Sequence, residues 1–155
     1  MRRFVALATA IPVASAAIAV LAMTTVAGAG PSALTETFRF VERDTTSAVT
    51  DTGAKGDSAG DILTWANVLY SASNTKSVGS DKGYCVRTVV RKAWECSWTA
   101  FLPGGQITVQ GPFLDAGPNK VAVTGGTGRF SGVAGWMEFR ARNDKEWDYT
   151  YHVQR

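Results

Sequence analysis

The chain has 155 residues, which is enough for a single globular domain. It holds 16 Lys and Arg against 13 Asp and Glu, and two of the basic residues, Arg2 and Arg3, stand in the N-terminal segment, so the remainder is almost neutral. Domains that bind nucleic acid present clustered Lys and Arg. The sequence has no such cluster, and we expect no nucleic-acid partner.

The N-terminal segment has the pattern of a secretory signal peptide. Arg2 and Arg3 are followed by an apolar run over residues 4–26 and by the small residues Ala27-Gly28-Ala29. A basic start, an apolar middle and an A-x-A cleavage site are the features of such peptides. We therefore expect cleavage after about Ala29 and a secreted protein.

This cleavage would divide the chain into a signal peptide, residues 1–29, and one domain, residues 30–155. The apolar run is long for a signal peptide, and Pro12 interrupts it. A retained membrane anchor is therefore the alternative, and only in that case do we expect contact with a membrane.

The rest of the sequence predicts strands and no helix. Eight strand-like segments are expected at 35–43, 61–71, 82–90, 93–102, 105–113, 119–124, 132–142 and 146–154. Short turns separate most of them and favour antiparallel neighbours, whereas residues 44–60, rich in Asp, Thr, Ser and Gly, predict a mobile loop. Eight such strands can close, so the expected fold is all-β, an eight-stranded antiparallel β-barrel.

The glycine cluster at residues 125–128 is interpreted as a turn between two of these strands. Glycine loops that cradle phosphate precede a helix, whose N-terminus carries partial positive charge. Here the following residues alternate like a strand, so a phosphate site is not expected.

A tight hairpin is predicted around Val90 and Arg91. This register places Cys85 opposite Cys96, on the face that also holds Trp94 and Trp98. Two cysteines in an exported protein indicate one disulfide. We predict a Cys85–Cys96 bond, which would stabilise the fold by roughly 2–3 kcal/mol.

Few residues offer conventional catalytic chemistry. His152 is the only histidine, and it falls on the polar face of the last strand. No Cys or His spacing typical of a metal site occurs, so we expect neither a metal nor a cofactor. Trp136 falls on a charged strand face and predicts a contact in a homo-oligomer. What remains is an aromatic-lined barrel that suits a small, largely apolar ligand.

Several short motifs resemble the allene oxide cyclase family and, more distantly, the dirigent proteins. The resemblance runs from about Phe38 to Val153, nearly the whole mature chain. The motifs are Glu42-Arg43-Asp44, Gly60-Asp61, Asn67-Val68-Leu69-Tyr70, Gly83-Tyr84-Cys85-Val86, Val109-Gln110-Gly111-Pro112-Phe113, Thr124-Gly125-Gly126-Thr127-Gly128 and Tyr149-Thr150-Tyr151. The resemblance implies an eight-stranded barrel whose apolar cavity controls the conformation of a reactive molecule during ring closure.

The resemblance also implies positions for a site. It places a water-holding asparagine at Asn67, a cavity cysteine at Cys85 and the family's glutamate at Arg39. The apolar cavity positions, with Trp98 added by alternation, are Leu63, Trp65, Trp94, Trp98, Val109 and Phe113.

Arg39 departs from the family pattern, because arginine stays protonated and cannot replace a carboxylate. True allene oxide cyclase activity is therefore not expected. We take Asn67 and Arg39 as candidate catalytic residues, with Arg39 binding a ligand carboxylate or enolate through its planar fork. The alternative is an arginine at the barrel mouth that pairs with an acidic loop residue.

The predicted function is that of an exported cyclase or isomerase that acts on a small hydrophobic precursor, with acids among the candidates. A lipocalin-like carrier, which binds such a molecule without changing it, is the first alternative. A surface protein whose barrel serves only oligomerisation or adhesion is the second.

Overall fold

The structure, a computed structural model, describes residues 35–155, and the predicted signal peptide lies outside them. The strands are β1 (Thr35–Arg43), β2 (Ala48–Thr50), β3 (Ile62–Ser71), β4 (Ser77–Val89), β5 (Ala93–Leu102), β6 (Gly105–Leu114), β7 (Asn119–Gly128), β8 (Ala134–Asn143) and β9 (Glu146–Gln154). Within residues 35–155 there is no helix that could cross a membrane.

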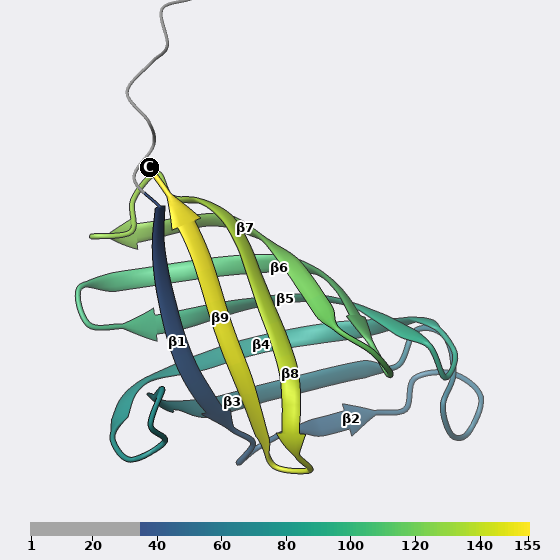
Figure 1. Ribbon diagram of the computed structural model, residues 1–155. Helices are drawn as coiled ribbons and strands as arrows, with labels where there is room; N and C mark the ends of the chain where they lie inside the picture. Colours follow the sequence, from purple (N-terminus) through teal and green to yellow (C-terminus); the bar gives the residue numbers. More distant parts are fainter. Residues whose placement is uncertain (1–34) are drawn as a thin grey trace, which may run out of the picture. The chain divides into compact units, whose positions relative to one another are not determined.

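The strands form one antiparallel sheet that closes on itself. From β3 to β9 each strand pairs with the next one in the chain, β9 pairs with β1, and β1 returns to β3, where Phe40 lies opposite Ser71 and Arg43 opposite Val68. In Figure 1, β1, β9 and β8 cross in front of the strands from β3 to β6. The predicted all-β, eight-stranded antiparallel barrel is confirmed.

Strand β2 is an addition to the eight. It lies in the segment that the sequence predicts to be a loop, and its Ala48–Thr50 pair with residues 62–64 of β3. Strands β1 and β2 therefore share the same edge of β3, one after the other. The prediction that residues 44–60 contain no strand is wrong, because β3 is longer than the stretch that β1 covers.

The structure also corrects the interpretation of the glycine cluster as a turn. Residues 125–128 belong to β7, and the chain reverses after them, at residues 129–133. A Cβ on Gly126 would lie 2.6 Å from the carbonyl oxygen of Gln106 on β6. The glycine thus permits close strand packing rather than a turn.

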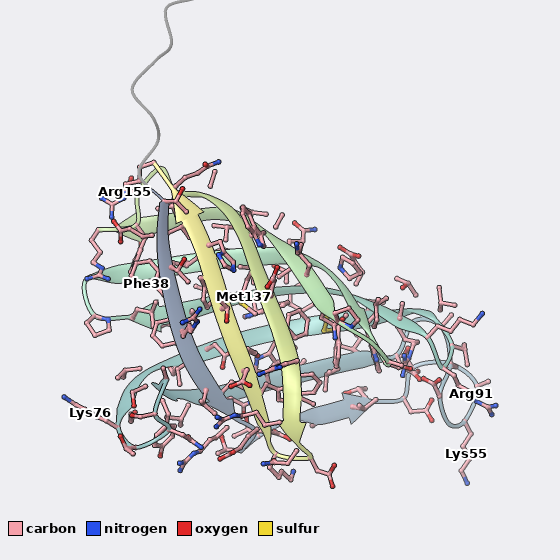
Figure 2. The ribbon with its side chains drawn as sticks, in the orientation of Figure 1. Phe38, Lys55, Lys76, Arg91, Met137 and Arg155 are labelled. Atoms are coloured by element: carbon pink, nitrogen blue, oxygen red, sulfur yellow. A yellow bond between two sulfur atoms is a disulfide. The ribbon has the colours of Figure 1, made fainter. Side chains whose placement is uncertain are left out.

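Alternation of apolar side chains fills the barrel. On β5, Trp94, Cys96 and Trp98 are buried, and on β9, Tyr149 and Tyr151 are buried. The buried face of β5 is the one on which the sequence places Cys96 with Trp94 and Trp98. Charged side chains on the loops, such as those of Lys55, Lys76 and Arg91, extend away from the barrel (Figure 2).

The β4–β5 hairpin has the predicted register. Cys85 lies opposite Cys96, and Gly83 lies opposite Trp98. The two cysteines form a disulfide, as predicted, and no described cysteine is free. On the outside, Trp136 is 39% exposed and stacks on His152 with ring centroids 4.8 Å apart. The oligomer contact at Trp136 stays a prediction.

Candidate active site

A cavity of about 220 Å³ opens at one end of the barrel. This is below the roughly 300–1,000 Å³ of pockets that hold drug-sized molecules, so the cavity suits a smaller ligand. The residues around it are Glu42, Asp44, Ser47, Leu63, Trp65, Asn67, Cys85, Cys96, Trp98, Phe113, Phe139, Asp144, Trp147 and Tyr149.

Aromatic rings form a large part of the cavity wall. The ring centroids of Trp65 and Trp98 are 5.9 Å apart, and those of Trp98 and Phe139 are 5.5 Å apart in an edge-to-face arrangement. Gly83 makes room for the two tryptophans, since a Cβ there would lie 2.7 Å from the Trp65 ring. Such interlocked rings give the cavity a fixed shape.

Glu42 forms the polar part of the cavity together with Asn67. Glu42 stands near the end of β1, and its side chain is buried because Phe38, Phe40 and Glu42 alternate toward the interior. The Asn67 amide on β3 donates a hydrogen bond from Nδ2 to Glu42 Oε1. Glu42 Oε2 is buried and has no hydrogen-bond partner among the described residues.

The orientation of the Asn67 amide is fixed by the chain that follows β1. Asn67 Oδ1 accepts hydrogen bonds from the backbone N–H of Thr45 at 2.8 Å and of Thr46 at 3.1 Å. The oxygen is therefore turned to these donors, and Nδ2 must face Glu42. Asn67 thus joins the loop after β1 to the acid in the cavity.

A second carboxylate lies behind the cavity wall. Asp81 on β4 is directly opposite Asn67 in the β3–β4 pairing and is fully buried. Its Oδ2 accepts a hydrogen bond from Trp65 Nε1 at 3.3 Å, and the Tyr149 hydroxyl also bonds to it. Asp81 Oδ1 has no hydrogen-bond partner among the described residues.

Burial makes both acids weak. It raises the pKa of Glu42 to about 8, the negative charge of Asp81 adds to this rise, and the Asn67 hydrogen bond opposes it. Burial likewise raises the pKa of Asp81 to about 7, although the bonds from Trp65 and Tyr149 stabilise its ionised form. Both groups are therefore much weaker acids than exposed carboxyls.

The structure brings together most of the residues that the sequence predicts for the site. Those that border the cavity are Leu63, Trp65, Asn67, Cys85, Trp98 and Phe113, with Cys96 beside them. Cys85 is disulfide-bonded and therefore offers no thiol. Three predicted residues do not border the cavity. Val109 is buried in the core, Trp94 lies under the Arg87 guanidinium at 3.9 Å, and Arg39 is exposed on the outside of β1.

Arg39 does not face the interior, and the expectation that it does is wrong. Its side chain is exposed on the outside of β1 and borders a surface groove with Arg140 and Asp148. Neighbouring residues of a strand point to opposite faces, so the inward alternation of Phe38 and Phe40 turns Arg39 outward. The expected arginine partner for a ligand acid is absent from the described part of this cavity.

The site that the sequence predicts does not include the acids Glu42 and Asp81. A signal for Asp81 exists in the sequence, because residues 81, 83 and 85 share a strand face and Cys85 is expected inward. Glu42 stands in the Glu42-Arg43-Asp44 motif itself, but its direction depends on the β1 register.

Comparisons with known proteins agree with this architecture. A pyocyanin demethylase superposes with a TM-score of 0.69 at 25% identity, covering 76% of this chain and 99% of that one. A pterocarpan synthase dirigent protein gives 0.68 at 15% identity, with 79% and 96% covered. An exo-specific intermolecular Diels–Alderase gives 0.68 at 16% identity, with 81% and 100% covered.

The two structures of lower identity establish a shared barrel fold. The sequence profile of the allene oxide cyclase family matches residues 34–143, well over half of the chain and including Glu42, Asn67 and Asp81. The protein therefore belongs to the allene oxide cyclase family.

Proposed function

We propose that this protein is an exported enzyme that cyclises or isomerises a small, mostly apolar molecule in its barrel cavity. The observation that supports this most is the buried acid pair Glu42 and Asp81 beside an aromatic wall. A carrier needs the wall but has no need of two buried acids, each with an oxygen that lacks a hydrogen-bond partner.

The wall would supply conformational control. A flexible precursor that is held folded between Trp65, Trp98 and Phe139 has its reacting ends close together, which removes much of the entropic cost of ring closure. The modest volume of the cavity restricts the number of ways in which such a molecule can fold.

The acid pair would supply proton transfer. A general acid or base works best when its pKa lies near the working pH, and both carboxyls are raised toward neutrality. The negative charge of Asp81 favours the protonated form of Glu42. Glu42 borders the cavity, so it would donate the proton to the substrate, and Asn67 would hold its carboxyl in place.

The relatives support chemistry in this cavity without identifying the substrate. Two of the proteins of the same fold are named for a synthase and a Diels–Alderase activity. The pyocyanin demethylase is 25% identical over almost its entire length. Demethylation of pyocyanin is therefore a second candidate, to be tested directly.

A mass-resolved incubation separates these candidates. The purified protein is incubated with a fractionated small-molecule extract and, separately, with pyocyanin, and the products are analysed by liquid chromatography and mass spectrometry. Cyclisation or isomerisation conserves mass, so the proposal predicts a new peak of unchanged mass that disappears with Glu42→Gln. A compound that is retained but unaltered would contradict catalysis and support the carrier, and loss of a methyl group from pyocyanin would support the demethylase.

Export is part of this proposal and is tested separately. It is supported by the signal-like N-terminal segment and by the Cys85–Cys96 disulfide, because disulfides persist in oxidising compartments. Expression of the full chain should give a secreted protein whose N-terminal sequence begins near residue 30. A membrane-bound protein with an intact N-terminus would support the retained anchor.

A further inference from the structure

We propose that the ligand of this cavity is a small organic cation that carries an N–H donor, such as an arylalkyl ammonium, and not a carboxylic acid. This inference rests on the proposed function, because it names the substrate class of the same cavity. It replaces the sequence-based expectation of an acidic ligand, which depended on Arg39 facing inward.

The charges around the cavity all have one sign. Glu42, Asp44 and Asp144 border it, and no Lys, Arg or His does so in the described part of the chain. Burial of an anion next to these groups would be unfavourable, since like charges repel strongly where water is scarce. A cation would instead gain from the rim carboxylates of Asp44 and Asp144, and from Glu42 once that carboxyl has lost its proton.

The basic residues nearest to the cavity are directed elsewhere. Arg43 donates from Nε to Asn74 Oδ1 at 3.0 Å and lies over the Tyr70 ring. Lys145 Nζ lies 3.3 Å from Asp44 Oδ2, and its side chain is 74% exposed. An exposed pair of this kind contributes little, so a ligand cation could compete with Lys145 at the rim.

The wall favours a cation as well. Six aromatic rings border the cavity, those of Trp65, Trp98, Phe113, Phe139, Trp147 and Tyr149. The face of an aromatic ring attracts a cation, with Trp the strongest, and aromatic cages are a known way of binding ammonium groups. A neutral hydrocarbon would use the same rings only through apolar contact.

An unpartnered oxygen indicates a donor on the ligand. Glu42 is 3% exposed and borders the cavity, and its Oε2 has no hydrogen-bond partner among the described residues. A buried acceptor without a donor is costly. Once Glu42 has lost its proton, an ammonium N–H would supply the missing bond as a charge-assisted one. A carboxylate ligand would add acceptors to a site that already lacks donors.

The neighbours of Glu42 give the proposal a pH dependence. Asp81 on β4, Asp44 after β1, and Tyr149 and Tyr151 on β9 are the titratable groups that act on Glu42 or Asp81. All four are acids. A bound cation would favour the ionised carboxylates, so its affinity should rise with pH as Glu42 and Asp81 lose their protons.

Four probes of one shape test the proposal. They share a phenyl ring on a tetrahedral centre: 2-phenylpropan-2-amine as its ammonium ion, phenyltrimethylammonium, tert-butylbenzene and 2-methyl-2-phenylpropanoate. Affinities are measured with the full, disulfide-bonded protein by tryptophan fluorescence. We expect the primary ammonium to bind about tenfold more tightly than tert-butylbenzene, phenyltrimethylammonium to lie between them, and the carboxylate to bind least.

Two variants identify the source of the preference. Glu42→Gln should reduce the preference for the primary ammonium to about threefold or less and leave tert-butylbenzene binding unchanged. Asp144 lies in the exposed turn between β8 and β9, where a substitution does not put folding at risk. Asp144→Asn should weaken the binding of the primary ammonium and of phenyltrimethylammonium slightly and equally.

The outcomes separate this inference from the proposed function. Equal binding of the ammonium and tert-butylbenzene, or tighter binding of the carboxylate, would overturn the cation proposal and leave a functional cavity. Absence of binding by all four probes would overturn the cation proposal and count against the cavity enzyme too. Product formation in the mass-resolved incubation would then decide whether catalysis occurs.

Discussion

Asn67 on β3 donates a hydrogen bond to Glu42 on β1, and its oxygen accepts from the backbone of Thr45 and Thr46. This one amide therefore couples the loop that follows β1 to the buried acid of the cavity. Asn67 belongs to one of the motifs that resemble the allene oxide cyclase family. Its hydrogen bonds in the barrel give that motif a structural role.

Replacement of Asn67 by leucine should destabilise the barrel by about 2–3 kcal/mol. The substitution leaves the Thr45 and Thr46 amides and Glu42 Oε1 without partners, and buried polar groups in that state are costly. Urea unfolding measures the change. Gln110→Leu, at an exposed position of β6, is the control and should change stability by less than about 0.5 kcal/mol. Equal effects of the two substitutions would contradict the role assigned to Asn67.

The stability of the protein should fall as pH rises from about 4.5 to about 8. Burial raises the pKa of Glu42 from 4.5 to about 8 and that of Asp81 from 3.8 to about 7. In this interval the native state holds protons that the unfolded chain has released, so the free energy of unfolding decreases with pH and levels off above about 8.

Urea unfolding at a series of pH values checks this dependence. Glu42→Gln removes one of the two groups, so its profile should be flatter between about pH 5 and pH 8. A wild-type profile that rises through this interval would show that the carboxyls are ionised and stabilised in the native state, in disagreement with the buried acid pair.

Loss of the Cys85–Cys96 bond should lower stability by roughly 2–3 kcal/mol, because the bond constrains the unfolded chain. The paired Cys85→Ala and Cys96→Ala variant measures this by urea unfolding. Thiol labelling of the denatured, unreduced wild type should find no free cysteine. Labelling of both cysteines under those conditions would show that the bond does not form in the folded protein.

Arg39→Met should leave the affinity of the cavity for small ligands unchanged within about twofold. Arg39 is exposed on the outer face of β1 and does not border the cavity. The measurement compares an acid with its methyl ester by fluorescence titration. Selective loss of acid binding would mean that Arg39 reaches a ligand after all.

The sequence predicts the fold well because two local signals agree, the alternation along the strands and the position of the turns. Alternation sets the inward faces of β5 and β9, and the turn at Val90 and Arg91 sets the β4–β5 register, including the Cys85–Cys96 pair. Both are local properties, and the barrel follows from their repetition.

The site is predicted less well, because the direction of a side chain on β1 depends on a non-local pairing. A shift of one residue exchanges the inward and outward faces of a strand. The family resemblance places the family's glutamate at Arg39, whereas Glu42 is the residue of β1 that borders the cavity. The raised pKa values of Glu42 and Asp81 are harder still to predict. They arise from burial by strands distant in sequence.

Titration of the Glu42 and Asp81 carboxyl carbons in a 13C-labelled protein by NMR shows directly whether the cavity holds an acid pair that ionises near neutral pH. We expect Glu42 and Asp81 to titrate between about pH 6 and pH 9, and Asp81 to keep a raised pKa in Glu42→Gln, because burial is its main cause. Titration of both carboxyls near pH 4, the range of exposed acids, would contradict this expectation.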